Sequence, residues 1–354
     1  MQIEAMEPRV LSRPSINRRP IGWWLLVIAA LIFAMVILGG VTRLTNSGLS
    51  IVEWQPVSGV VPPLDDQAWQ VEFDKYRQYP EYQKKNRGMS LAEFKRIYAF
   101  EYAHRLLGRV IGVAFAVPFL YFLLRGRISP ALAPQLFAIF LLGAAQGGLG
   151  WFMVRSGLVD RPDVSQYRLA AHLGLAVAIY GYVLWVAFSL LAPGEARSSQ
   201  RGLGNFGIMV VLAIVLQMLL GALVAGLDAG FVYNTWPLME GSLVPSGLFP
   251  DQPWWRNAFE DIMTVQFDHR IGAYLIAVAV VLLCWRAILV REFGVKVRFA
   301  VKLLLAALLL QIALGVATLL YVVPVPLAAA HQAGALLLLS AALWLAYRLR
   351  TTAA

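Results

Sequence analysis

The chain has a single cysteine, Cys284, and only four histidines among its 354 residues. One cysteine excludes an intrachain disulfide and a thiolate metal cluster. Charged residues are also scarce, at 14% of the chain against 59% hydrophobic residues, a composition far from the average of soluble domains. The sequence therefore predicts a membrane protein in which Cys284 is a membrane-embedded residue without a chemical role.

Eight apolar segments are each close to the roughly 20 residues that a helix needs to span a bilayer. They lie at about 22–41, 103–124, 132–154, 168–191, 206–226, 269–290, 299–323 and 327–347. The predicted fold class is all-α: a polytopic membrane protein with eight transmembrane helices. The first segment follows Arg18 and Arg19 but lacks a small-x-small cleavage site, so we interpret it as a retained helix and not a signal peptide.

The formal net charge of +10 reports membrane orientation and not a nucleic-acid partner. Most of the basic residues outside the longest connecting segments lie near the chain ends and in short alternate loops, as is typical of cytoplasmic segments. They are Arg9, Arg13, Arg18, Arg19, Arg125, Arg127, Arg197, Arg201, Arg291, Lys296, Arg298, Arg348 and Arg350. We therefore expect a multi-pass protein of the cell inner membrane, surrounded by membrane lipid, with both termini cytoplasmic.

The four histidines fall into two matching pairs. His104 and His269 each precede an arginine, in Glu-Tyr-Ala-His-Arg and Gln-Phe-Asp-His-Arg. His172 and His331 each follow two alanines, in Leu-Ala-Ala-His and Ala-Ala-Ala-His. This pattern indicates an internal duplication with two candidate bis-histidine metal centres.

The duplication extends beyond the histidines. The offset of 165 residues between His104 and His269 also separates Gln146 from Gln311. Because each repeat has an even number of spans, both repeats have the same orientation. We predict two tandem pseudo-symmetric four-helix bundles, related by an axis along the membrane normal. Each histidine lies near the start of a span that enters from outside, so all four are expected on the periplasmic side.

The predicted domains are a cytoplasmic N-terminal tail at 1–21, an N-terminal four-helix half at 22–200 and a C-terminal four-helix half at 201–354. The N-terminal half includes an external segment at about 44–100. At the end of this segment, Ser90-Leu-Ala-Glu matches a capping box. We therefore expect a helix that starts there and continues directly into the membrane.

Haem iron suits these histidine pairs better than zinc does. Imidazole is a common axial ligand of haem iron, and a four-helix bundle can hold a porphyrin between facing helices. A zinc site usually needs three or four protein ligands, whereas each half offers two histidines and no thiol. A lone histidine in a membrane helix is more often a packing residue, and it is the duplication that favours metal ligation by His104, His172, His269 and His331.

Glu101 is the main asymmetry between the halves. Positions i, i+3 and i+4 share a helix face, which places Glu101 beside His104 and Arg105. The second half has the neutral Gln266 at the matching place. An ionisable group in a membrane helix is costly and tends to be functional, which favours general-base chemistry by Glu101. The alternative is an ion pair with Arg105 or Arg109.

Two further pairs of polar residues are candidates for the haem sites. Arg105 and Arg270 each follow a histidine and are candidates for binding haem propionates, with snorkelling towards the lipid headgroups as the alternative. Gln146 and Gln311 are expected either to contact a haem edge or to bridge helices. The sequence leaves both choices open.

Several separated motifs occur in one order along the chain. They are Leu-Gly-Gly-Val-Thr-Arg-Leu-Thr at 38–45, Gly-Leu-Ser at 48–50, Glu-x-x-His-Arg at 101–105 and the three other histidine segments. Together they resemble the haem A synthase family over nearly the whole chain. Since extracellular cysteine pairs are absent, the sequence is most similar to the alphaproteobacterial and mitochondrial branch.

The resemblance implies an oxidoreductase that oxidises a ring methyl group of its substrate, haem O, to the formyl group of haem A for terminal cytochrome oxidase. It implies that His104 and His172 flank the substrate in the N-terminal half, with Glu101 as the catalytic acidic residue. It implies that His269 and His331 ligate a haem b cofactor. Haem O synthase and cytochrome oxidase assembly factors are the implied partners, and a homo-oligomer stays open.

The main alternative is a di-haem b membrane cytochrome that only transfers electrons, with quinone or another carrier. A haem-carrying protein without turnover ranks below it. The cytochrome predicts similar surroundings in both halves and gives no reason for the difference between Glu101 and Gln266.

Overall fold

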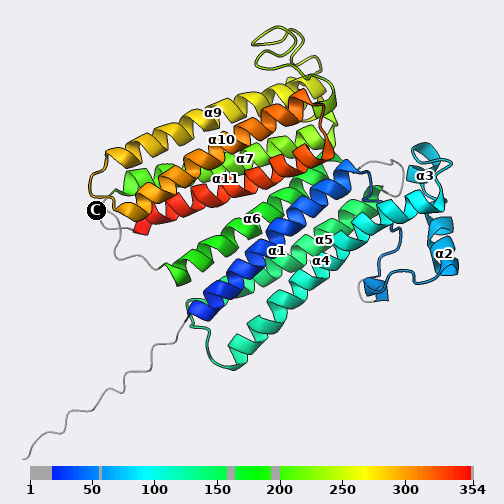
Figure 1. Cartoon of the computed structure of the whole chain (residues 1–354), viewed down its shortest axis with the longest axis horizontal. Coiled ribbons are helices and arrows are strands. Elements are labelled where there is room, and N and C mark those ends of the chain that lie inside the picture. Colours follow the sequence, from blue (N-terminus) through cyan, green and yellow to red (C-terminus); the bar gives the residue numbers. More distant parts are fainter. Residues whose placement is uncertain (1–17, 56–57, 158–163, 193–199, 352–354) are drawn as a thin grey trace, which may run out of the picture.

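Eight long helices form the body of the protein (Figure 1). The structure, a computed structural model, describes residues 18–55, 58–157, 164–192 and 200–351. The eight helices are α1 (Arg19–Leu44), α4 (Leu91–Leu124), α5 (Ala133–Gly157), α6 (Gln166–Leu191), α7 (Arg201–Gly226), α9 (Ile262–Leu289), α10 (Val295–Leu320) and α11 (Val325–Thr351). They coincide with the eight predicted spans, and the described residues include no β-strand, so the predicted all-α membrane fold is confirmed.

The helices of the two halves have corresponding neighbours. In the first half α1 packs against α4 and α6, and in the second half α7 packs against α9 and α11. The halves meet where α6 contacts α7 and where α1 contacts α11. This arrangement is what a tandem repeat predicts, although the pseudo-two-fold axis itself stays a prediction.

Both ends of the described chain lie at the same end of the helix bundle, at the left of Figure 1. The helices that carry the histidines, α4, α6, α9 and α11, all begin at the opposite end, where the external segments also lie. The side chains at this end therefore include all four histidines, in the first part or first half of each helix.

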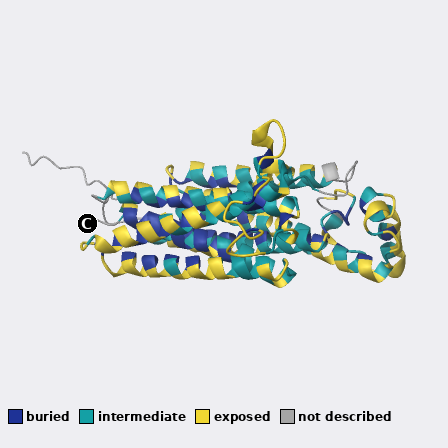
Figure 2. Ribbon diagram, turned by 90° about the horizontal axis from the view of Figure 1, so that it is seen from above, coloured by how far each residue is buried: buried dark blue, intermediate teal, exposed yellow. Residues whose placement is uncertain are grey.

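The apolar core follows the helix faces that meet inside the bundle. Val183, Leu283, Leu304 and Leu336 are fully buried and belong to one continuous cluster. Large apolar side chains are also exposed on the outward faces, for example Leu275 at 66%. Figure 2 shows the buried residues along the middle of the bundle, with exposed residues around them. An apolar outer surface is what a bilayer solvates, because its hydrocarbon core is about as apolar as leucine.

The external part of the first half contains η1 (Ser58–Val60), α2 (Asp66–Tyr76) and α3 (Pro80–Lys84). It ends in the capping box predicted from the sequence: Ser90 Oγ accepts from Glu93 N, and the Glu93 carboxylate accepts from Ser90 N at 2.8 Å. This cap satisfies backbone N–H groups that have no partner within the helix. From there α4 continues for 34 residues without a break, as predicted.

An aromatic cluster attaches this external part to the start of α4. Its buried members are Ile51, Phe73, Tyr76, Phe94 and Tyr98. Phe94 is fully buried, and its ring centroid lies 5.0 Å from that of Phe73 and 5.2 Å from that of Tyr76. The cluster therefore acts as a small core outside the membrane bundle.

The external part of the second half has a different structure. It contains η2 (Ala229–Phe231), η3 (Trp254–Arg256) and α8 (Asn257–Glu260). Trp254 and Trp255 are exposed, at 64% and 54%, which suits side chains that anchor at a membrane interface. Both halves thus carry an external cover, but only the first has an aromatic core of its own.

We predict that Phe94→Ala loosens the external part of the first half. Removing a fully buried phenylalanine ring costs about 3–5 kcal/mol, and this ring holds α2 against α4. Hydrogen exchange at the backbone amides of 66–84 should therefore become faster. Val71→Ala on α2, where the side chain is 49% exposed, is the matched control and should leave exchange unchanged. Equal protection in both variants would contradict a supporting role of the cluster.

Candidate functional site

The structure brings the histidines together in the two predicted pairs. His104 on α4 and His172 on α6 are close enough to interact electrostatically, and so are His269 on α9 and His331 on α11. All four rings are partly buried. Each half therefore contains one histidine pair on non-adjacent helices of its own bundle.

Each histidine ring lies against a glycine of a neighbouring helix. The pairs are His104–Gly39, His172–Gly150, His269–Gly221 and His331–Gly315. A Cβ atom at these glycines would lie 2.9 to 3.1 Å from the ring. Since this is closer than ordinary van der Waals contact, any larger residue would push the imidazole away, and the glycines determine where the rings can lie.

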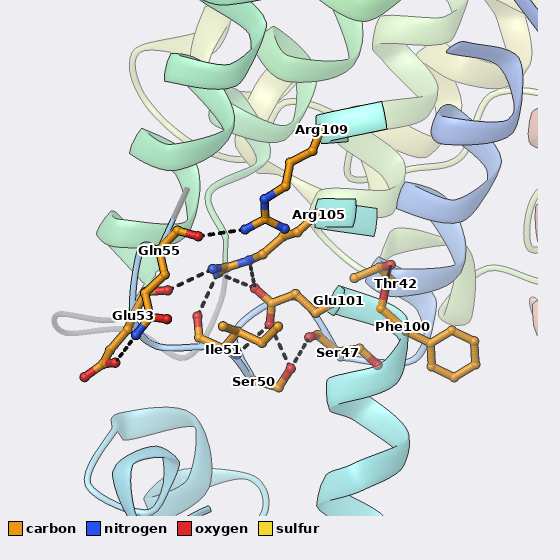
Figure 3. Close-up of polar contacts among 10 residues, drawn as sticks. All are labelled: Thr42, Ser47, Ser50, Ile51, Glu53, Gln55, Phe100, Glu101, Arg105 and Arg109. Carbon is orange, nitrogen blue, oxygen red and sulfur yellow. Dashed lines mark hydrogen bonds and ion pairs between the residues drawn. The ribbon is translucent and has the colours of Figure 1, made fainter. Parts of the chain in front are cut away.

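Glu101 is buried at the outer end of the first half, with 3% of its surface exposed. Its Oε2 accepts hydrogen bonds from Ser50 Oγ at 2.8 Å and from the backbone N of Ile51 at 2.7 Å. Its Oε1 accepts from Arg105 Nε at 3.0 Å and Nη2 at 2.6 Å (Figure 3). The ion pair with Arg105, which the sequence offered as an alternative for Glu101, is therefore formed.

Arg105 also holds the loop that follows α1. Its Nη2 donates to the carbonyl of Ile51 at 2.7 Å, and its Nη1 donates to the carbonyl of Glu53 at 3.0 Å. Arg109, one turn further along α4, donates to the carbonyl of Gln55 at 2.8 Å (Figure 3). A guanidinium group has five N–H donors, and Arg105 uses most of them on Glu101 and this loop.

Arg270 makes the corresponding contacts in the second half. We call each of these arginines, with the loop carbonyls that it binds, a clamp. It donates to the carbonyls of Tyr233 at 2.7 Å and Thr235 at 2.8 Å, and to Gln266 Oε1 at 3.1 Å. The amide of Gln266 in turn donates to the carbonyl of Ala229 at 2.9 Å. Both halves thus fasten an external loop to the helix that carries the first histidine.

The two clamps differ in hydrogen-bond polarity. The loop presents an N–H and a hydroxyl to Glu101, which accepts both, whereas the other loop presents a carbonyl to Gln266, which donates to it. A carboxylate matches the first loop and an amide matches the second. The difference between Glu101 and Gln266 therefore has a structural reason in addition to any catalytic one.

Two glutamines hold histidines across helix contacts. Gln146 Nε2 lies 3.2 Å from His172 Nδ1 and donates to its backbone carbonyl at 3.0 Å. Gln217 Nε2 lies 3.0 Å from His269 Nδ1 and donates to its backbone carbonyl at 2.7 Å. Gln146 thus bridges helices, one of its two predicted roles. The sequence analysis missed Gln217, although Gln-x-x-x-Gly recurs at 146, 217 and 311.

Comparison with known proteins identifies the family. The sequence model of a family described as cytochrome oxidase assembly protein matches residues 22–343. The chain is 56% identical to a heme A synthase of Nitrosospira multiformis, over 94% of both chains. It is 50% identical to one of Parvibaculum lavamentivorans, over 97% of this chain and 98% of the relative.

The chain belongs to the haem A synthase family. A third relative, a heme A synthase of Paramagnetospirillum magneticum, is 50% identical over 92% of both chains. The resemblance inferred from the motifs is therefore confirmed.

The donor sets in this member of the haem A synthase family fit haem iron. Within the described parts of the chain, no group of three or more His, Cys, Asp or Glu side chains could hold a metal ion. Haem iron needs only two axial ligands from the protein, which a histidine pair supplies. On α5, a Cβ at Gly143, Gly147 or Gly148 would meet no atom within 4 Å, and all three residues are exposed.

We predict that Arg105→Lys frees the loop at 47–55 while leaving the loop at 229–235 unchanged. Lysine keeps the charge but lacks the planar fork that reaches Glu101 and two carbonyls together. Hydrogen bonds to charged groups contribute about 1.5–3 kcal/mol, so hydrogen exchange in the first loop should be at least about tenfold faster. Arg270→Lys is the matched control and should affect only the second loop. Faster exchange of both loops in either variant would show that the clamps are not independent.

Proposed function

We propose that this protein is a haem A synthase, an oxidoreductase that converts a ring methyl group of haem O to the formyl group of haem A for terminal cytochrome oxidase. The strongest support is the 56% identity to a heme A synthase over 94% of both chains. The paired histidines support the same function, because they offer haem ligands in both halves. Haem O synthase and cytochrome oxidase assembly factors are the proposed partners.

The two histidine pairs have different proposed roles. His104 and His172 flank the substrate haem O, and His269 and His331 ligate a resident haem b. When bound, haem b supplies one-electron redox chemistry at its iron. The position of Glu101 on α4, three residues before His104, supports this division.

Glu101 is the proposed catalytic acidic residue. Its Oε2 accepts a hydrogen bond from the Ser50 hydroxyl at 2.8 Å, and this oxygen is where we place proton uptake during the reaction. Arg105 orients the carboxylate through Oε1. The chain's own contribution is then to hold a buried carboxylate beside the first histidine pair and to keep its loop closed.

Propionate binding is proposed for both arginines that follow a histidine, and the support is stronger for Arg270. Its buried Nε has no hydrogen-bond partner among the described residues, and a buried unpaired N–H is costly. A propionate oxygen would satisfy it. Arg105 already donates through Nε and both terminal nitrogens, which leaves it one N–H for a propionate.

We place the protein in the cell inner membrane with both termini cytoplasmic and the histidines towards the periplasmic side. The support is that Arg18, Arg348 and Arg350 lie near the two chain ends, which share one end of the bundle. Basic residues favour the cytoplasmic side. The histidine helices begin at the other end.

A di-haem b cytochrome that only transfers electrons is the second candidate. One observation favours it: Glu101 and Gln266 each match the loop that faces them, so their difference does not require catalysis. Chromatography of the bound haems separates the two functions. A pure electron carrier holds haem b alone, whereas the synthase retains some haem O, hydroxylated intermediate or haem A.

We predict that alanine variants of the four histidines divide into two classes. His269→Ala and His331→Ala should lose most of the bound haem b, because each variant removes one of the two histidines that would hold it. His104→Ala and His172→Ala should keep haem b and lose bound haem O and haem A. Pyridine haemochrome spectra with chromatography of extracted haems measure both. Loss of haem b from the first-half variants instead would reverse the assignment.

We predict that Glu101→Gln abolishes haem A formation while haem O still binds. Loss of a general acid or base typically lowers the rate by about 10²–10⁴-fold. The amide also places a donor against Ser50 or Ile51, so a structural effect is controlled with Arg109→Lys, which weakens the hold on the same loop at Gln55 but leaves Glu101 and Arg105 in place. Haem A formation at the normal rate in Glu101→Gln would end the catalytic proposal. Equal loss in both variants would assign Glu101 a structural role.

A further inference from the structure

Met35 on α1 occupies the place that a glutamine occupies in three other helices. Each of the four glycines that contact a histidine has a characteristic residue four positions earlier. This residue is a glutamine on α5, α7 and α10, and it is Met35 on α1. Since α1 corresponds to α7 in the repeat, the direct comparison is between Met35 and Gln217.

Contacts across the helices place the two side chains equivalently. A Cβ at Gly108 of α4 would lie 3.4 Å from Met35 Cε. In the second half, a Cβ at Gly272 of α9 would overlap the amide oxygen of Gln217. Both side chains therefore lie against the histidine helix about one turn beyond the histidine.

The chemical difference between them determines how the histidine is held. Gln217 Nε2 donates to the backbone carbonyl of His269 and lies 3.0 Å from its Nδ1. A thioether has no N–H and accepts hydrogen bonds only weakly. Within the described residues, the ring nitrogens of His104 make no hydrogen bond, whereas its partner His172 lies within hydrogen-bond distance of Gln146.

His331 is a useful comparison because its Nδ1 also lacks a hydrogen bond in the described structure. Its ring nevertheless lies against Gly315 of α10, one turn after Gln311. The facing helix therefore carries the side-chain amide of Gln311 at this place. His104 is the one histidine whose facing helix supplies no amide at this place.

We propose that Met35 leaves His104 free to turn away from a bound haem iron, so that a coordination position can open in the first half. Gln217 keeps His269 in place as a permanent ligand. Met35 and Gln217 are thus positioning residues that act through the histidines. This inference rests on the proposed function, in which these histidines are haem ligands.

An exchangeable ligand suits a site through which a substrate haem passes. Groups that orient a metal-bound histidine typically change metal affinity or activity by about 10–100-fold. A permanent ligand suits a resident cofactor, whose iron has no need of an open position. Met35, four positions before Gly39, and Gln217, four positions before Gly221, thus match the roles proposed for their halves.

The test exchanges the two residues and measures carbon monoxide binding to the dithionite-reduced, haem-loaded protein. Wild-type protein should bind carbon monoxide at one haem. Met35→Gln should slow that binding by about tenfold, the lower end of the effect of histidine-orienting groups. Gln217→Met should make the second haem reactive, and Met35→Leu, which also lacks an amide, should resemble the wild type.

Two results would overturn the inference. One is Met35→Gln protein with normal haem content that binds carbon monoxide at the wild-type rate. The other is Gln217→Met protein whose second haem stays unreactive, a variant that adds no polar group and so tests the idea even if Met35→Gln does not fold. Unchanged haem spectra in both His104→Ala and His269→Ala would instead show that these histidines are not ligands, a failure of the proposed function.

Discussion

A bilayer offers no water to form hydrogen bonds with polar groups, and the arrangement of the helices and of the polar side chains among them depends on that constraint. Backbone groups are satisfied within eight helices, and the polar side chains among them have to find partners in the chain itself. Glu101 does so with Arg105, Ser50 and Ile51. A carboxylate could not stay buried at this place if any of these partners were lost without rearrangement.

The same requirement links the membrane helices to the external loops. Arg105 and Arg270 lie on helices, but the carbonyls they bind belong to loops that follow the first helix of each half. Arg105 directly follows His104, and Arg270 directly follows His269. The residue that holds the loop and the histidine therefore lie in the same helix turn. The carboxylate at 101 and the amide at 266 show how the two clamps differ: each side chain matches the loop atoms that face it.

Close approach of helices is the second physical feature of the site. A glycine beside each histidine lets the imidazole contact the neighbouring backbone, and the residue four positions earlier then decides whether an amide reaches the ring. Glycine is needed at these four places because a Cβ would occupy the space of the ring. The position four residues before the glycine is not restricted in this way: it holds a glutamine on α5, α7 and α10 and Met35 on α1.

The sequence by itself determined the membrane class, the eight spans, the capping box at Ser90 and the pairing of histidines, because each is a local pattern of hydrophobicity, spacing or repeated motif. It also carried enough motifs to indicate the family. Only the tertiary structure decided what Glu101 and Gln217 contact. Apart from Arg105 on the same helix, the partners lie 50 or more residues away along the chain, and whether a loop amide or a histidine meets a side chain depends on how the helices pack.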